Sequence, residues 1–139
     1  MNKLINVQED EIAIRNLLND VITAFNEANL EKLLSYHTDD IILMEPNMPI
    51  IHGKNQVREL FEDFKKKKIK MQLGFDILEL EVNEKRAFVR GQVRKTVLQN
   101  GAENGHDTGK FICLLRKQHD GTWLRTHVIV NSDQPALNN

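Results

Sequence analysis

The sequence has little of several features that mark specialised classes of protein. Its 139 residues include one cysteine, Cys113, which excludes an internal disulfide and fits a reducing compartment such as the cytoplasm. No apolar run approaches the roughly 18 residues that a membrane span needs, and the N-terminus has no secretory apolar segment. The formal net charge of −1 gives no overall attraction to nucleic acid or to an anionic membrane. We therefore expect a cytoplasmic protein that binds neither nucleic acid nor membrane.

Motifs for metal, cofactor or nucleophilic chemistry are lacking as well. The five histidines never occur at i, i+2 or i, i+4 spacing, and no cysteine or carboxylate cluster accompanies them. The sequence contains no glycine-rich phosphate loop. Cys113 lies within the apolar run 111–115, a setting typical of a buried, inert thiol. The sequence thus predicts no bound metal and no cofactor.

What is present is the composition of one globular domain. Hydrophobic residues make up 40% of the chain and charged residues 28%, which is ordinary for a chain that buries a single core. No repeat, linker or low-complexity tract divides the sequence. We expect one domain over residues 1–139, with its core at about 8–135.

The N-terminal half predicts three helices. From Gln8 to Asn29 apolar residues recur at spacings of three and four, which marks one helical face. A short second helix is expected from Leu30 to about Thr38. A third helix begins near Gly53. Its buried stripe consists of Val57, Leu60, Phe61 and Phe64.

A predicted strand before the third helix ends in a carboxylate. Ile41–Met44 is a continuous apolar run, which indicates a strand covered on both faces. Pro46 ends the strand, because proline cannot donate to a ladder. Glu45 therefore either points to solvent, where it can pair with lysine or arginine, or lies on a cavity wall. In the second case desolvation would raise its pKa and suit it to proton transfer.

The second half predicts an antiparallel sheet. Apolar residues occupy odd positions from Met71 to Ile77 and even positions from Leu78 onwards, and this change of phase predicts a β-bulge and a strongly curved sheet. A loop at 99–105 and a hairpin turn at Asp120–Gly121 are expected. They separate strands at 86–98, 109–118 and 122–131. The sequence predicts an α+β fold in which three helices cover the concave side of the sheet and leave an internal pocket.

Several motifs are shared with a known superfamily. They are Leu30-x-x-Leu33-Leu34-x-Tyr36-x-x-Asp39-Asp40, Glu45-Pro46, Ile51-His52-Gly53-x-x-Gln56, Gly109-Lys110-Phe111, Asp120-Gly121-Thr122-Trp123 and Asn131-Ser132. With these motifs the chain resembles the SnoaL-like, ketosteroid-isomerase-like superfamily over about residues 8–135. The resemblance implies the cone-shaped, cystatin-like fold named after nuclear transport factor 2. It leaves function open, since the superfamily includes isomerases, cyclases, dehydratases, hydrolases and oligomerisation domains.

The resemblance also implies a candidate catalytic residue. In the steroid isomerase a carboxylate before a proline shuttles the proton, and Glu45 before Pro46 matches it in kind. The tyrosine and protonated aspartate that hold the enolate in that enzyme correspond to Val21 and Cys113, by ungapped matching. Losing one such donor costs on the order of 10²–10³ in rate. Steroid isomerisation by that mechanism is therefore not expected, and Glu45 remains as an acid/base candidate.

The candidate ligand-binding residues face the predicted pocket and match the pocket wall of the superfamily. They are Val21, Phe25, Leu60, Phe61, Cys113, Thr126, Val128 and Val130. Because nearly all of them are apolar, the pocket should accept a small apolar ligand. Thr126, His127 or a water would have to replace the missing donors.

Two functions remain open at this point. The first is a small-molecule binder, or an acid/base enzyme of isomerase, cyclase or hydrolase type, that uses Glu45. The second is a non-catalytic homodimeric module for ligand sensing or oligomerisation. A homodimer is expected because one face of the last strand has the composition of an interface, and the resemblance implies pairing through the same surface. That face would present Trp123, Arg125, His127 and Ile129.

Overall fold

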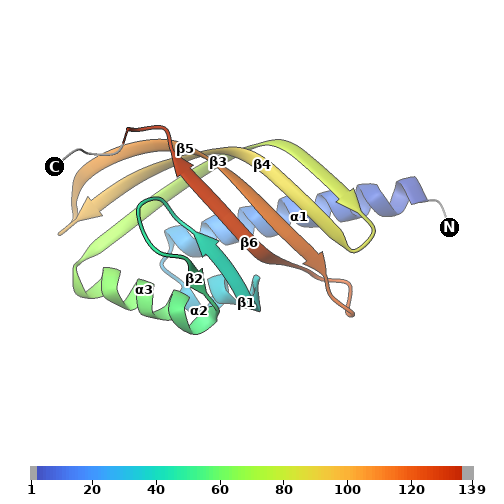
Figure 1. The fold of residues 1–139 in the computed structure, drawn as a ribbon, viewed down its shortest axis with the longest axis horizontal. Coiled ribbons are helices and arrows are strands. Elements are labelled where there is room, and N and C mark those ends of the chain that lie inside the picture. Colours follow the sequence, from blue (N-terminus) through green and yellow to red (C-terminus); the bar gives the residue numbers. More distant parts are fainter. Residues whose placement is uncertain (1–2, 136–139) are drawn as a thin grey trace.

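The computed structural model describes residues 3–135 as helices packed on one curved sheet (Figure 1). The helices are α1 (Lys3–Asn26), α2 (Leu30–Leu34) and α3 (Lys54–Lys66). The strands are β1 (His37–Met44), β2 (Ile51–His52), β3 (Ile69–Asn83), β4 (Arg86–Gln99), β5 (Ala102–Lys117) and β6 (Trp123–Ser132). The predicted α+β class, with N-terminal helices on a curved sheet, is confirmed.

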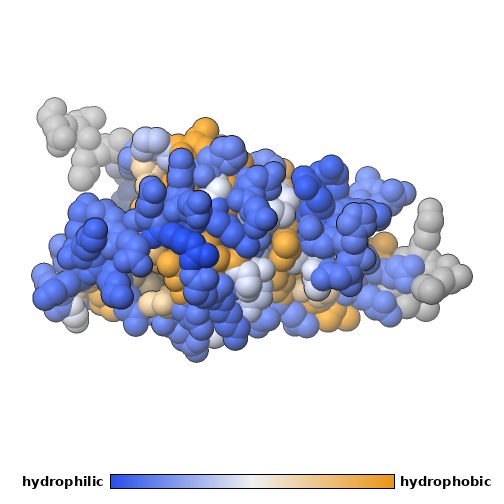
Figure 2. Space-filling view, turned by 90° about the horizontal axis from the view of Figure 1, so that it is seen from below, coloured by the Kyte–Doolittle hydropathy of each residue, from blue (hydrophilic) through white to orange (hydrophobic). Residues whose placement is uncertain are grey.

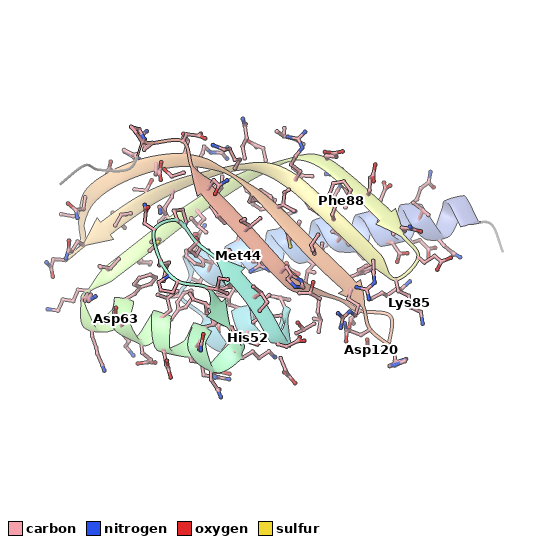
Figure 3. All side chains as sticks on the ribbon, viewed as in Figure 1. Met44, His52, Asp63, Lys85, Phe88 and Asp120 are labelled. Carbon is pink, nitrogen blue, oxygen red and sulfur yellow. The ribbon has the colours of Figure 1, made fainter. Side chains whose placement is uncertain are left out.

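The strands form one sheet in the order β2-β1-β6-β5-β4-β3. The pairs β3–β4, β4–β5 and β5–β6 are antiparallel, as predicted. β1 pairs parallel with β6, which the sequence did not indicate, and antiparallel with β2. This pairing places Met44, at the end of β1, next to Ile129 of β6, while His52 lies on the far side of β1 (Figure 3). The strand that ends at Glu45 thus lies beside the last strand of the chain.

The curvature of the sheet has the predicted origin. Ile77 pairs with Gly91 and Glu79 pairs with Arg90, so Leu78 is the extra residue of a β-bulge. A Cβ atom at Gly91 would lie 2.1 Å from the carbonyl oxygen of Asp76, so only glycine allows this approach. In Figure 1 the long strands arch over the helices.

Several element boundaries differ from the predictions. The loop expected at 99–105 is a tight turn, because β5 begins at Ala102 and only Asn100 and Gly101 connect the strands. Both turn residues have positive φ, 54° and 80°, as a type I′ hairpin requires. The second helix ends at Leu34 and β1 begins at His37, four residues earlier than the predicted apolar run.

Strand β6 also contains a bulge, and this corrects the predicted alternation of its faces. Leu114 pairs with His127 and Leu115 pairs with Arg125, so Thr126 is an extra residue. The predicted outward position of Trp123 and Arg125 is therefore wrong. Trp123 is 4% exposed, and Arg125 lines the interior.

Polar contacts fix the long helix α1 to the sheet at both ends. Near its start, Asp10 Oδ1 accepts hydrogen bonds from Trp123 Nε1 at 3.1 Å and from Lys117 Nζ at 2.9 Å. At its end, the Asn26 side chain donates to the Leu73 carbonyl at 2.9 Å and accepts from the Leu73 amide at 2.8 Å. Between these contacts the apolar face of α1, including Ile14, packs into the core.

The surface seen from the side of α3 is mostly hydrophilic (Figure 2).

Within residues 3–135, no helix combines the length and the apolar character that a membrane crossing requires.

Candidate functional site

A cavity of about 320 Å³ lies between the helices and the concave side of the sheet. Six of the eight predicted ligand-binding residues line it, and they come from α1, α3 and β6. They are Val21, Phe25, Leu60, Phe61, Val128 and Val130. The ring pairs Phe25–Phe61 and Phe61–Phe64 meet edge to face, with centroids 5.6 and 6.0 Å apart. The wall is mainly apolar because the inward faces of two amphipathic helices and of the bent strands converge on it.

The other two predicted ligand-binding residues lie outside the cavity wall. Cys113 is fully buried in the core, where burial raises the pKa of its thiol to about 11. Thr126 is the bulged residue of β6, and its hydroxyl donates to the Leu114 carbonyl at 3.2 Å. Neither group is in a position to replace the donors that the steroid isomerase uses.

Glu45 lies on the cavity wall, immediately after β1. It is half-buried, and its neighbours Pro46 and Met48 line the cavity with it. Burial raises the pKa of the Glu45 carboxyl above its usual value of 4.5, while the positive charges of Lys95 and Arg125 oppose the rise. The sequence left open whether Glu45 points to solvent or lies on a cavity wall. The structure has Glu45 on the wall, partly desolvated. Such a carboxyl can accept or deliver a proton near neutral pH more readily than an exposed one.

Two further polar residues of the cavity were not among the predicted site residues. His37, at the start of β1, is 1% exposed, and Arg125 of β6 lies beside it. Arg125 Nη2 lies 2.5 Å from His37 Nε2. Burial, reinforced by the charges of Arg125 and Lys54, lowers the pKa of His37 to about 2, so its ring is neutral. An arginine has only donors, so His37 accepts at Nε2 and carries its proton on Nδ1.

The sequence held a signal for Arg125. Trp123 is at an odd position, whereas Val128 and Val130 are at even positions, the same change of phase that revealed the bulge at Ile77. A bulge between them turns Trp123 and Arg125 inward, which is the arrangement found. His37 had no comparable signal, since its side of the strand depends on the unpredicted parallel pairing with β6.

The remaining polar part of the cavity lies on strands β4 and β5 of the sheet. Lys95 of β4 is paired with Asp107 of β5, and Asp107 accepts hydrogen bonds from the Ser132 hydroxyl at 2.8 and 3.0 Å. Lys95 and Asp107 both line the cavity. Among the described residues, no group of three or more His, Cys, Asp or Glu side chains is arranged to hold a metal ion. The polar chemistry of the cavity therefore consists of the partly desolvated carboxyl of Glu45, the hydrogen-bonded carboxyl of Asp107, and several cationic or neutral donors.

Several solved structures share this fold. A ketosteroid isomerase-like protein from Erwinia carotovora atroseptica has 24% identity and a TM-score of 0.78, covering 89% of this chain and 96% of that chain. A protein from Catenulispora acidiphila in complex with S-DNPA has 16% identity and a TM-score of 0.77, covering 91% and 95%. A nuclear transport factor 2-like protein with a cystatin-like fold from Novosphingobium aromaticivorans has 15% identity and a TM-score of 0.75, covering 93% and 85%. At these identities the likeness establishes the fold alone.

The sequence itself gives the family. A search of curated proteins found no significant match. The family model of the SnoaL-like domain matches residues 18–126, which is most of the chain and includes Glu45, His37 and Arg125. The chain therefore belongs to the SnoaL-like domain family.

Proposed function

We propose that the protein binds a small, largely apolar molecule in the cavity and that Glu45 exchanges a proton with it. The observation that carries this proposal is a half-buried carboxyl on the wall of a mainly apolar cavity of about 320 Å³. That volume lies at the lower end of the range for small-molecule sites. The Catenulispora acidiphila protein supports the proposal, because it has the same fold and its structure is a complex with S-DNPA.

The chemistry open to Glu45 is general acid/base catalysis. Its raised pKa makes the carboxylate a stronger base towards a carbon acid, and it keeps a larger fraction of the group protonated for donation to a leaving group. Reactions of this type include the isomerisations, cyclisations and hydrolyses that fit one acid/base group without metal or cofactor. Glu45→Gln should keep ligand binding and lose turnover by about 10²-fold or more. A variant that retains full turnover would remove Glu45 from the chemistry.

Binding can be tested separately by thermal shift with a panel of apolar carbonyl compounds. A ligand that binds only the folded protein raises its melting temperature. Val130→Phe should abolish the rise, because the larger ring occupies the cavity that Val130 lines. Ile12→Phe is the control, since Ile12 is 60% exposed on α1 and does not line the cavity. Equal rises in both variants would place the ligand outside the cavity.

A second candidate function, a homodimeric module, is supported by an apolar patch on the outer face of the sheet. We define the outer patch as Phe88, Ile112, Leu114 and Ile129. Three of these side chains are exposed large hydrophobics, with 42%, 41% and 38% exposure for Ile112, Leu114 and Ile129. Cross-strand pairing puts Ile112 beside Ile129 and Leu114 beside Phe88, which Figure 3 labels on β4. Contiguous exposed apolar surface of this kind marks interaction sites, and we propose that two copies of the chain pair through it.

We also propose a reducing, cytoplasmic location. The single thiol, Cys113, is fully buried in the core, and its pKa of about 11 keeps it protonated. It is therefore not placed to form a disulfide with another molecule.

A further inference from the structure

Among residues 3–135, three buried side-chain nitrogens have no hydrogen-bond partner: Arg116 Nε, outside the cavity wall, and one nitrogen on each of two residues that line the cavity. His37 Nδ1 and Arg125 Nε are buried and make no hydrogen bond to any described residue. Because His37 accepts from Arg125 at Nε2, its Nδ1 carries a hydrogen and is a donor. A buried donor without a partner costs about 1–3 kcal/mol. Two such donors on neighbouring side chains of the cavity favour an acceptor supplied from outside the chain.

The charge of Arg125 also lacks a counter-ion. Among the ion pairs of residues 3–135, none includes Arg125. Glu45, which also lines the cavity, attracts it without forming an ion pair, and the partial desolvation of Glu45 favours the neutral acid. The neighbouring His37 ring is neutral, so it does not offset the charge. Buried charges in proteins are ordinarily paired, and an arginine left unpaired beside a cavity favours a ligand that brings the negative charge.

We propose that His37 and Arg125 form the recognition point for a carboxylate, so that the ligand of this cavity is an apolar carboxylic acid. The carboxylate accepts from the guanidinium of Arg125 and from Nδ1 of His37, and the apolar frame contacts the phenylalanine rings of α1 and α3. This assignment names the ligand class of the proposed function and depends on that function.

A set of matched probes tests the proposal by calorimetry at neutral pH. 2-Naphthoate, 2-naphthylmethanol and 2-naphthylmethylamine have the same apolar frame with a negative, a neutral and a positive group. Wild-type protein should bind the acid about tenfold or more tightly than the alcohol, because hydrogen bonds to a charged group are the stronger kind. The amine should bind more weakly than the alcohol.

Two variants with the same change of charge locate the effect. Arg125→Gln should lower the affinity for the acid to that of the alcohol and leave the alcohol nearly unaffected. Arg90→Gln is the control, since Arg90 is exposed on the same sheet and pairs with Glu79 at 2.8 Å. This variant should keep the full preference for the acid.

The outcomes separate this inference from the proposed function. Equal binding of acid and alcohol by the wild type would overturn the carboxylate assignment and leave the apolar cavity site intact. No binding of any probe would overturn both. If Arg125→Gln does not fold, the Nε–H resonance of Arg125 in the wild type decides the question. It should shift with 2-naphthoate and stay in place with the alcohol, and no shift with the acid would contradict the proposal.

Discussion

At the scale of single residues, the cavity holds two ionisable groups whose pKa values burial moves in opposite directions. The Glu45 carboxyl is raised and the His37 imidazole is lowered, because desolvation disfavours the charged form of each. Both groups are thereby shifted towards neutrality, whereas Arg125, which contacts His37, brings a positive charge to the cavity. The position of Glu45 before Pro46 was readable from the sequence. The extent of its burial could not be read from the sequence, because it depends on the pairing of strands that are far apart in the sequence.

The buried histidine predicts a loss of stability in acid. The pKa of His37 is about 2 in the folded protein and 6.5 in the unfolded chain, so below pH 6.5 the unfolded state gains a proton that the folded state refuses. This one group should lower the free energy of unfolding by about 2 kcal/mol between pH 7 and pH 5. Urea denaturation at both pH values measures the loss in the wild type and in His37→Gln. The variant should lose less by that amount, and equal losses would contradict the assignment.

At the scale of elements, changes in the phase of the apolar pattern carried the most information. The change at Ile77 predicted the bulge of β3. The same kind of change in β6 also indicates a bulge, and a prediction without that bulge places Arg125 on the wrong face of the sheet. The hairpin at Asn100–Gly101 was mistaken for a longer loop because residues 102–108 are polar and lack an alternating pattern. The parallel pairing of β1 with β6 is a long-range contact, and local pattern contains no information on it.

Glycine at position 91 should be essential to the curvature of the sheet. Gly91→Ala would put a methyl group 2.1 Å from the Asp76 carbonyl oxygen and 2.8 Å from the Phe111 ring, so the bulged strands would have to separate. We expect a loss of about 1–3 kcal/mol in the free energy of unfolding. The control is Gly105→Ala, where a Cβ atom meets nothing within 4 Å. Similar stabilities of the two variants in urea denaturation would contradict this role for Gly91.

At the scale of the whole molecule, the sequence predicted the cone and its cavity wall better than the polar groups inside. Apolar residues on helices and strands have a period that assigns them to a face, and six of the eight expected positions line the cavity. Polar residues such as His37 and Lys95 cannot be assigned to the cavity by their periodicity, since the same residue types cover the solvated surface. The outer patch differs from the predicted interface because of the bulge in β6. The bulge turns Trp123 and Arg125 inward, so exposed apolar residues of β5 take their place in the patch.

The outer patch predicts a dimer that one charge should disrupt. Light scattering of the wild type at micromolar concentration should give twice the 16.1 kDa mass of the chain. Leu114→Glu should give the mass of the monomer, because a charge at the centre of an apolar contact is left desolvated and unpaired. Ile12→Glu is the control, since Ile12 is 60% exposed on α1 and lies outside the patch. A monomeric wild type would refute the dimer.

The most direct test of the account is the titration of the Glu45 carboxyl carbon by ¹³C NMR, with the resonance assigned by its loss in Glu45→Gln. A desolvated carboxyl on the cavity wall should titrate with a pKa above 4.5, and addition of 2-naphthoate should raise the pKa further, because a second negative charge enters the cavity. A pKa at or below 4.5 that does not respond to the ligand would place Glu45 in solvent and contradict its role in this site.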